Sequence, residues 1–519
     1  MKKEDLFIAM SDIDPAFLDE AEAFQVKKKK RLVPFIISLA AVFAVIISLA
    51  LINEFGGEEL LPENHTSNES VQDIDNSSQQ SQQNNSSGEG NKTEYSPIKG
   101  TVLAKAEYPE MVQYPILAES ADPDFYNTEE YRQNYEDWRE QEYEYLGTEI
   151  DSRPVNEFSF ALFDKLLSEE DGLNKAVSPV NIYMALSVLA ETCGGNTRKQ
   201  ILDALGVTDI EALRENASAI WKKNFMNDGA TKSVIANSLW LSDDVKYKKQ
   251  TVLTIAEKYL SSVHSGKMGT EGYNNMINAW INEQTDGMFS PDVKTGKDTV
   301  LAIASTVLFN AKWQSGFFKG ETEEGIFHSP SGDKKADFMH RKTQMLYFWG
   351  EKYTAVYMDF DMTGRMWFIL PDEGFTPEEV MSEKELQDIL LLPVNLFYSH
   401  KNAAPVMVDL YVPAFDISSE SRLIDTLSEM GITDVLDPVK ADFSPLSDER
   451  PIYLSEAMHN VRVKADEEGV SAAAYTLMLE ATGSMPPEEE VLLRFDRPFG
   501  FVITHDSETV LFAGVVNEP

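Results

Sequence analysis

The chain has 519 residues, of which 43% are hydrophobic, and a formal net charge of -41 at pH 7. Phosphate binding depends on clustered Lys and Arg, so this acidity argues against a nucleic-acid partner. Cys193 is the only cysteine, which excludes an internal disulfide, and a domain without disulfides depends on a large apolar core.

An uncharged apolar run occupies residues 32–52, and its length of about 20 residues matches the thickness of a bilayer core. We therefore expect a transmembrane helix and, with it, a lipid partner. Basic residues from Lys27 to Arg31 precede the run and acidic residues follow it, so the positive-inside rule predicts a cytoplasmic tail over 1–31. A cleaved signal peptide is the alternative, but the run exceeds the usual length of such a segment and no small-residue cleavage motif follows closely.

Everything after this anchor is then expected outside the cell, and the lack of disulfides fits a bacterial surface better than an animal secretory pathway. Residues 53–100 are rich in Ser, Asn and Gln and cannot bury enough apolar surface to fold, which predicts a disordered linker. Aromatic residues return in an acidic extension over 101–153, which we expect to contain a helix that lies against the main domain.

From residue 154 the apolar pattern becomes dense and alternates between helical and strand periods. Ser178 is a ready N-cap, with Pro179 at the first helical position. Helices are predicted at 157–167, 179–193, 272–286 and 419–430, strands at 233–241, 299–313, 366–370 and 406–413, and further strands in 491–517 around a turn at Asp506 and Ser507. These elements predict a large mixed domain with several sheets.

Motifs for catalysis are missing from the sequence. It contains no G-x-S-x-G, no H-E-x-x-H and no Gly-rich phosphate loop, and its seven histidines never fall into a metal-ligand spacing. Cys193 lies late in an apolar helix, where a buried structural thiol is the expected role rather than a nucleophile. We expect a protein that is not an enzyme and that holds no cofactor and no metal.

The most unusual segment is 467–487, with the sequence EEGVSAAAYTLMLEATGSMPP. If it forms a strand, Val470, Ala472, Ala474 and Thr476 share one face, because side chains alternate with period two. All four are small, so such a strand could slide between two existing strands without overpacking the core. An ordinary Ala-rich helix turn or loop is the alternative reading.

The start of this segment, EEGVSAAA, resembles the hinge of the reactive loop in the serpins, a family of protease inhibitors, and the sequences on both sides of it are serpin-like as well. IYLSEAMHNVRVKAD precedes it, and SMPPEEEVLLRFDRPFGFVI follows. Earlier serpin-like segments are NEFSFALFDKLL, VSPVNIYMALSVLA, ANSLWL, INAWINEQTDGM, STVLFNAKW, FILPDEG, VPAFDI and ADFSPL, and the chain ends in LFAGVVNEP. The resemblance covers 154–519 in order, which makes it highly specific.

The resemblance implies an α+β serpin fold of about nine helices and three sheets with an exposed reactive loop. A serine protease would attack the loop and form an acyl-enzyme, and the cut loop would insert into the largest sheet. The family spacing places the scissile bond between Gly483 and Ser484. It assigns the hinge to Glu467, Glu468, Gly469, Val470, Ser471, Ala472, Ala473 and Ala474, and sheet-gating positions to Ser178, Ser305, Trp313 and His459. Outside the resemblance, a satisfied buried histidine is an equally ordinary role for His459.

Four positions depart from the family pattern. Ser305 stands where many relatives have Asn, and Ala414 where some have a Lys that faces Glu467. Val470 replaces the usual Thr or Ser, but it is compact and β-branched. Glu480 would face inward near the end of the inserted strand, where burial of a carboxylate without a partner is costly. Either water reaches that end of the strand, or the register is shifted by one residue.

No Lys or Arg lies near the expected bond, which disfavours trypsin-like targets. Gly483 would suit a small specificity pocket such as that of elastase-like or subtilisin-like proteases, and some cysteine proteases could also accept it. We expect a monomer. The alternatives are a non-inhibitory surface protein on the same scaffold and a signal transducer, although a long disordered linker transmits strain poorly.

Overall fold

The computed structural model describes residues 102–115, 128–146, 149–168, 170–361, 363–449, 451–455, 457–470, 489–506 and 509–519. All of them belong to the second of two compact units, residues 89–519. The expected tail (1–31), membrane helix (32–52) and linker (53–100) lie outside the described residues. Among the described helices, none combines the length and the apolar character that a membrane span requires. The anchor therefore stays a prediction.

The first sheet has the strand order β1-β5-β4-β6-β14-β13-β12, with β3 paired to β4. Its neighbouring strands are antiparallel, except that β4 and β5 are parallel. The strands are β1 (Val102–Ala104), β3 (Met226–Asn227), β4 (Lys232–Ser242), β5 (Ser261–Gly266), β6 (Leu301–Lys312), β12 (Phe415–Arg422), β13 (Met458–Ala465) and β14 (Gly469–Val470).

The second sheet has the order β15-β11-β8-β9-β10-β16-β17-β2, with β7 paired to β8. Because the 18-residue β8 pairs with β7, β11 and β9, the described strands form two connected networks, whereas the resemblance implied about three sheets. The strands are β2 (Lys175–Val177), β7 (Glu323–Ser329), β8 (Gly332–Trp349), β9 (Tyr353–Asp359), β10 (Arg365–Pro371), β11 (Ala403–Pro413), β15 (Glu490–Arg494), β16 (Phe499–Thr504) and β17 (Val510–Val516).

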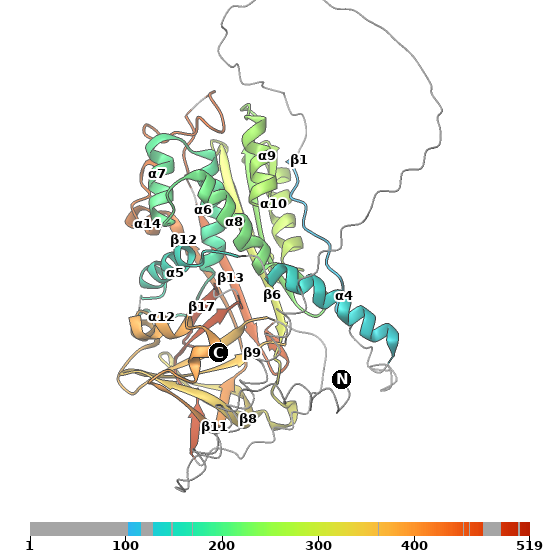
Figure 1. Ribbon diagram of the computed structural model, residues 1–519. Helices are drawn as coiled ribbons and strands as arrows, with labels where there is room; N and C mark the ends of the chain where they lie inside the picture. Colours follow the sequence, from blue (N-terminus) through green and yellow to red (C-terminus); the bar gives the residue numbers. More distant parts are fainter. Residues whose placement is uncertain are drawn as a thin grey trace, which may run out of the picture. The chain divides into compact units, whose positions relative to one another are not determined.

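Most of the long helices surround the first sheet. Figure 1 shows α7, α9 and α14 gathered at one end, whereas β8, β9 and β11 lie at the other. The helices are α4 (Glu129–Leu146), α5 (Arg153–Leu166), α6 (Pro179–Thr192), α7 (Gly195–Ala204), α8 (Ile210–Asn224), α9 (Lys249–Lys258), α10 (Glu271–Gln284), α11 (Pro377–Met381), α12 (Lys384–Leu390), α13 (Val394–Phe397) and α14 (Leu423–Glu429), with 3-10 turns η2 (Lys319–Glu321) and η3 (Asp434–Leu436).

The predicted elements of the main domain are confirmed with one exception. The helix predicted at 419–430 is wrong over its first residues, because β12 continues to Arg422 and α14 begins at Leu423. Phe415 and Ile417 are buried on one face of β12, and β13 pairs with every residue of that strand. This pairing overrides the local helical pattern.

The extension over 101–153 packs against the rest of the unit. As predicted it contains a helix, α4, whose buried Trp138 donates a 2.9 Å hydrogen bond from Nε1 to Asp228 Oδ2. Tyr108 lies against Trp221 with 5.0 Å between ring centroids. The strand β1, which adds to the edge of β5, was not predicted, because three residues are too few to show a strand period.

Helix α6 lies at the centre of the core and is buried on nearly all sides, as its apolar sequence requires. Cys193 follows it directly and is fully buried, and burial raises the pKa of its thiol to about 12. The structure thus supports a structural role for this thiol. The first turn of α6 contacts the first sheet at Ser305 through Asn181. This contact connects the central helix to the candidate site.

Candidate functional site

The expected hinge begins in a tight turn whose backbone Trp313 holds in place. Asp466 N–H donates to Gly469 O at 2.9 Å. The Trp313 ring donates from Nε1 to Asp466 O at 2.9 Å, and the Trp313 backbone N–H donates to Glu468 O at 3.0 Å. The Trp313 ring in turn stacks on Phe360, with 4.9 Å between centroids. A rigid aromatic pair therefore fixes the entrance to the hinge.

The two hinge carboxylates have partners near η2. Glu467 Oε1 accepts a 2.7 Å hydrogen bond from Thr322 Oγ1, and Glu468 forms an ion pair with Lys319. This ion pair raises the pKa of the Lys319 ammonium. With Ala414 where some relatives have a Lys, Glu467 is thus bound by a neutral hydroxyl, and the cation at this turn, Lys319, pairs with Glu468.

Gly469 and Val470 form β14 and enter the first sheet between β6 and β13. Val470 pairs with Ala311 on one side and with Ala465 on the other, and its side chain is 3% exposed. A Cβ atom on Gly469 would lie 2.2 Å from Ala311 O, so only glycine permits this approach.

The expected site residues that follow lie outside the described residues. These are Ser471, Ala472, Ala473 and Ala474 of the hinge and the reactive bond between Gly483 and Ser484. Glu480 lies outside the described residues as well.

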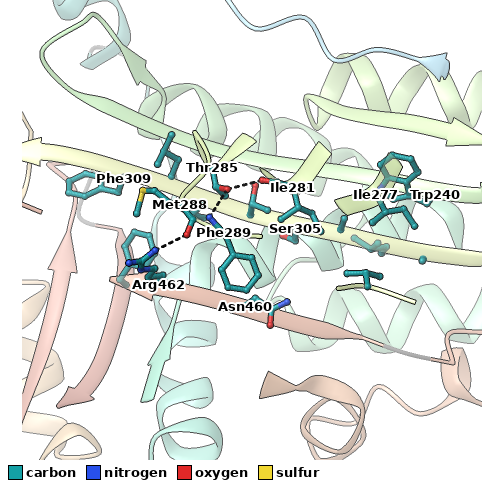
Figure 2. A pocket seen from close by; sticks show the side chains of 18 of the residues that line it. Trp240, Ile277, Ile281, Thr285, Met288, Phe289, Ser305, Phe309, Asn460 and Arg462 are labelled. Carbon is teal, nitrogen blue, oxygen red and sulfur yellow. Dashed lines mark hydrogen bonds between the residues drawn. The ribbon is translucent and has the colours of Figure 1, made fainter. Parts of the chain in front are cut away.

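On the side of β14 that is remote from the hinge turn, the described strands β6 and β13 run next to each other without pairing. We name the gap between their facing edges the seam. Within the described residues, β6 pairs with β4 from Leu301 to Asn310 and β13 pairs with β12, but no ladder joins β6 to β13. A cavity of about 100 Å³ lies along this seam, lined by residues of both strands and of the segment after α10 (Figure 2). Thr306 Oγ1 and Asn460 Oδ1 are buried there with no described partner. The seam has the polar edges that an added strand could pair with.

The N-terminus of α6 holds both sides of the seam from beneath. Ser178 N–H donates to His459 Nε2 on β13 at 3.0 Å. The Ser305 hydroxyl on β6 lies between the side-chain amides of Asn181 and Asn237 and, with one hydrogen, can donate to only one of their oxygens at a time. Three of the expected gating residues, Ser178, Ser305 and His459, therefore meet around one helix end.

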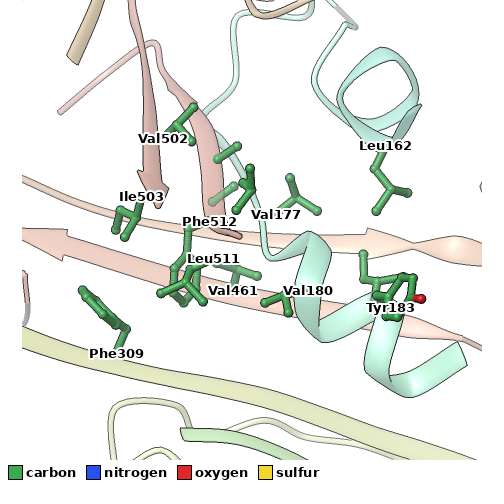
Figure 3. Packing of buried hydrophobic residues seen from close by; sticks show 14 of the residues in the cluster. Leu162, Val177, Val180, Tyr183, Phe309, Val461, Val502, Ile503, Leu511 and Phe512 are labelled. Carbon is green, nitrogen blue, oxygen red and sulfur yellow. The ribbon is translucent and has the colours of Figure 1, made fainter. Parts of the chain in front are cut away.

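Trp313, the fourth expected gating residue, instead holds the hinge turn. The predicted N-cap position of Ser178 is confirmed, but its side chain makes no capping hydrogen bond; its backbone N–H is used to bind His459. Apolar packing continues the arrangement beneath the sheet, where Phe309 lies 6.3 Å from Phe512 between ring centroids and Val461 lies near Leu511 and Val180 (Figure 3).

Sequence reasoning missed several polar partners. Asn181 and Asn237 were not singled out, and neither were Lys319 and Thr322. Each is far from its partner in sequence, and a single Asn, Thr or Lys carries no motif. The only usable signal was the departure at Ala414, which implied that the hinge carboxylates needed another partner.

Burial of His459 predicts a pH-dependent stability. Burial lowers the pKa of its imidazole from 6.5 to about 4, so the unfolded chain binds the proton more tightly than the folded protein does. The contribution of His459 to stability is therefore fully present above pH 6.5 and is lost as the pH falls toward 4. His264 and His505 have the same shift and contribute in the same direction.

The test is His459→Gln, which keeps an acceptor for Ser178 N–H and removes the titration. Between pH 6 and 4.5, the unfolding free energy of the variant should fall less steeply than that of the wild type, by roughly 1.4 kcal/mol per pH unit. Urea unfolding at a series of pH values gives both slopes. Equal slopes would show that His459 does not titrate as its burial requires.

Comparison with known proteins gives a consistent result. The family described as "Serpin (serine protease inhibitor)" matches residues 153–519. The chain is 30% identical to alpha-1-antiproteinase of Callosciurus caniceps over 379 residues, 70% of this chain and 87% of that protein. It is 28% identical to the plasma serine protease inhibitor of Mus musculus, covering 70% and 89% of the two chains.

Solved structures agree on the fold. Native tengpin, a thermophilic serpin, matches with a TM-score of 0.63 and 27% identity over 72% of this chain and 95% of tengpin. Thyroxine-binding globulin in complex with thyroxine matches with a TM-score of 0.62 and 24% identity over 71% and 99% of the two chains. The second likeness concerns the fold alone.

Proposed function

Because the chain belongs to the serpin family, we propose that residues 153–519 inhibit serine proteases by loop cleavage, acyl-enzyme trapping and loop insertion into the first sheet. Members of this family act as suicide substrates rather than as catalysts. The observation that carries the proposal is the position of Gly469 and Val470, which occupy the entrance of a seam with unpaired strand edges. The chain that follows them begins at the point where an inserted strand would begin.

The composition of the loop supports insertion. Val470 is already buried in the sheet, and period-two alternation places Ala472, Ala474 and Thr476 on the same face. These small side chains would fill the seam without overpacking the apolar residues beneath it.

The register supports insertion as well. Val470 is paired antiparallel with Ala311, and continuing that register places residue 480 opposite Leu301, the first residue of β6. Glu480 would therefore lie at the end of the sheet, where a carboxylate can reach water. Gly483 would lie beyond that end, about 43 Å from Val470 at 3.3 Å per residue.

The rival function is a non-inhibitory role on the same scaffold. Thyroxine-binding globulin shows that the fold can also be found with a small ligand. A binding or signalling protein would have no need of a small-residue hinge, and Ala472, Ala473 and Ala474 favour the inhibitor.

We also place the inhibitor on a bacterial cell surface as a monomer, anchored in the lipid bilayer by residues 32–52. The support is the uncharged apolar run and the basic residues before it. Its expected partner is an extracellular serine protease with a small specificity pocket of the elastase-like or subtilisin-like kind. A cysteine protease with such a pocket is a second candidate partner.

The first functional prediction concerns the hinge. Ala472→Glu combined with Ala474→Glu should convert the inhibitor into a substrate, because each carboxylate would be buried unpaired and insertion would lose to deacylation. Ala473→Glu is the matched control, since in an inserted strand its side chain would point to the other face. SDS-stable complex and cleaved inhibitor are measured after mixing with an elastase-like protease. A double variant that traps protease as well as the wild type would rule out strand insertion.

The second prediction concerns specificity. Elastase-like and subtilisin-like proteases should form stable complexes faster than trypsin does, because no basic residue lies near Gly483. Mass spectrometry of the released C-terminal peptide locates the bond, which we expect between Gly483 and Ser484. A bond outside 481–486, or trypsin as the fastest target, would contradict the assignment.

The third prediction concerns topology. Protease added to intact cells should remove residues of the inhibitor domain and leave the tail over 1–31 protected. Antibodies against each end, with a cytoplasmic protein as control for cell integrity, report the result. Protection of the domain on cells whose other surface proteins are digested would show that it is not outside.

A further inference from the structure

The segment after α10 is fastened along that helix by three asparagines. Asn274, Asn278 and Asn282 are four residues apart and share one helix face. Asn274 Oδ1 accepts from Thr295 N–H at 3.1 Å, and Asn278 Oδ1 accepts from Val293 N–H at 2.9 Å. Asn282 Nδ2 donates to Phe289 O at 3.1 Å. We name residues 285–295 the strap. Because of these hydrogen bonds, the strap and helix α10 should move as one body.

This body is attached to the β4 side of the seam. Tyr273 Oη donates to Leu241 O at 3.1 Å, and the buried Trp240 packs against Tyr273 with 5.5 Å between ring centroids. Lys232 on β4 forms a 2.6 Å ion pair with Asp286 at the start of the strap. Strands β4 and β6 are paired along almost their whole length, so the strap should move with both.

The opposite side of the seam contacts the strap through Arg462 on β13. Arg462 Nη1 donates to Met288 O at 2.8 Å, and its Nε and Nη2 bind both oxygens of Asp416 on β12 at 2.8 and 2.6 Å. Figure 2 shows this hydrogen bond and the ring of Phe289 beside it, at the cavity between the strands. The bond from Arg462 therefore crosses from one half of the sheet to the other.

We propose that Arg462 is a positioning residue that holds the strap across the seam and sets the rate at which the seam accepts a strand. The proposal rests on the insertion proposed above. A strand added between β6 and β13 needs neighbours about 4.8 Å away on each side, so the two halves must separate. A hydrogen bond of 2.8 Å cannot span that separation, and the strap cannot follow both halves. The bond to Met288 O must break before the strand enters.

The test measures uptake of a synthetic peptide that copies residues 470–483, so it needs no target protease. Arg462→Ala should take up the peptide about tenfold faster than the wild-type protein, the factor expected when one charge-assisted hydrogen bond is lost. Asp416→Ala is the matched control, because it removes the same exposed ion pair and leaves the bond to Met288 O in place. Its uptake rate should stay within about twofold of wild type.

Two further measurements separate this role from a general loss of stability. Hydrogen exchange of residues 285–295 should rise in Arg462→Ala and not in Asp416→Ala, and Phe289→Ala should also speed peptide uptake. Thermal unfolding of each variant checks that it folds. Equal uptake rates for wild type and Arg462→Ala, or an equal effect of Asp416→Ala, would overturn the role of Arg462. Failure of every variant and of the wild type to take up peptide would overturn strand insertion itself and this inference with it.

Discussion

The described structure depends on one constraint, which is that the first sheet has two strands whose facing edges are not paired with each other. Backbone N–H and C=O groups in a buried sheet normally find partners, and the groups left without them carry a cost in free energy. Along β6 and β13 this cost is confined to the facing edges, because the other edge of β6 is paired with β4 from Leu301 to Asn310 and the other edge of β13 is paired with β12 along its whole length. A strand that enters the seam would recover these hydrogen bonds.

Contacts on both faces of the sheet link the two sides of the seam. Beneath it, the N-terminus of α6 binds β13 through His459 and β6 through Ser305. Above it, Arg462 links the strap to β13. At its entrance, Trp313 and the hinge carboxylates hold the turn before β14. Most of these contacts are single hydrogen bonds or ion pairs, and Trp313 adds a second hydrogen bond and a stack on Phe360.

The sequence alone was sufficient to predict helices and strands whose apolar residues recur with a regular period along the chain. Apolar periodicity predicted α6, α10, β4 and β6, and the expected hinge begins in the sheet at Gly469 and Val470, while its Ala-rich part stays a prediction. Contacts between distant residues could not be predicted in this way. Nothing near Arg462 indicates that it binds Met288, and nothing near Thr322 indicates that it binds Glu467. Strand β12 was mistaken in part for helix because its partner β13 lies far along the chain.

The edge strand β1 adds a final geometric relation. Val102 pairs with His264, which lies beside Trp240 of β4, and Trp240 pairs with Ala302 near the start of β6. The hinge joins β6 at Ala311, nine residues farther along, which is about 30 Å in a strand. The chain before Val102 therefore joins the sheet at the end remote from the hinge. The attachment proposed above would therefore meet the sheet at the end opposite the hinge.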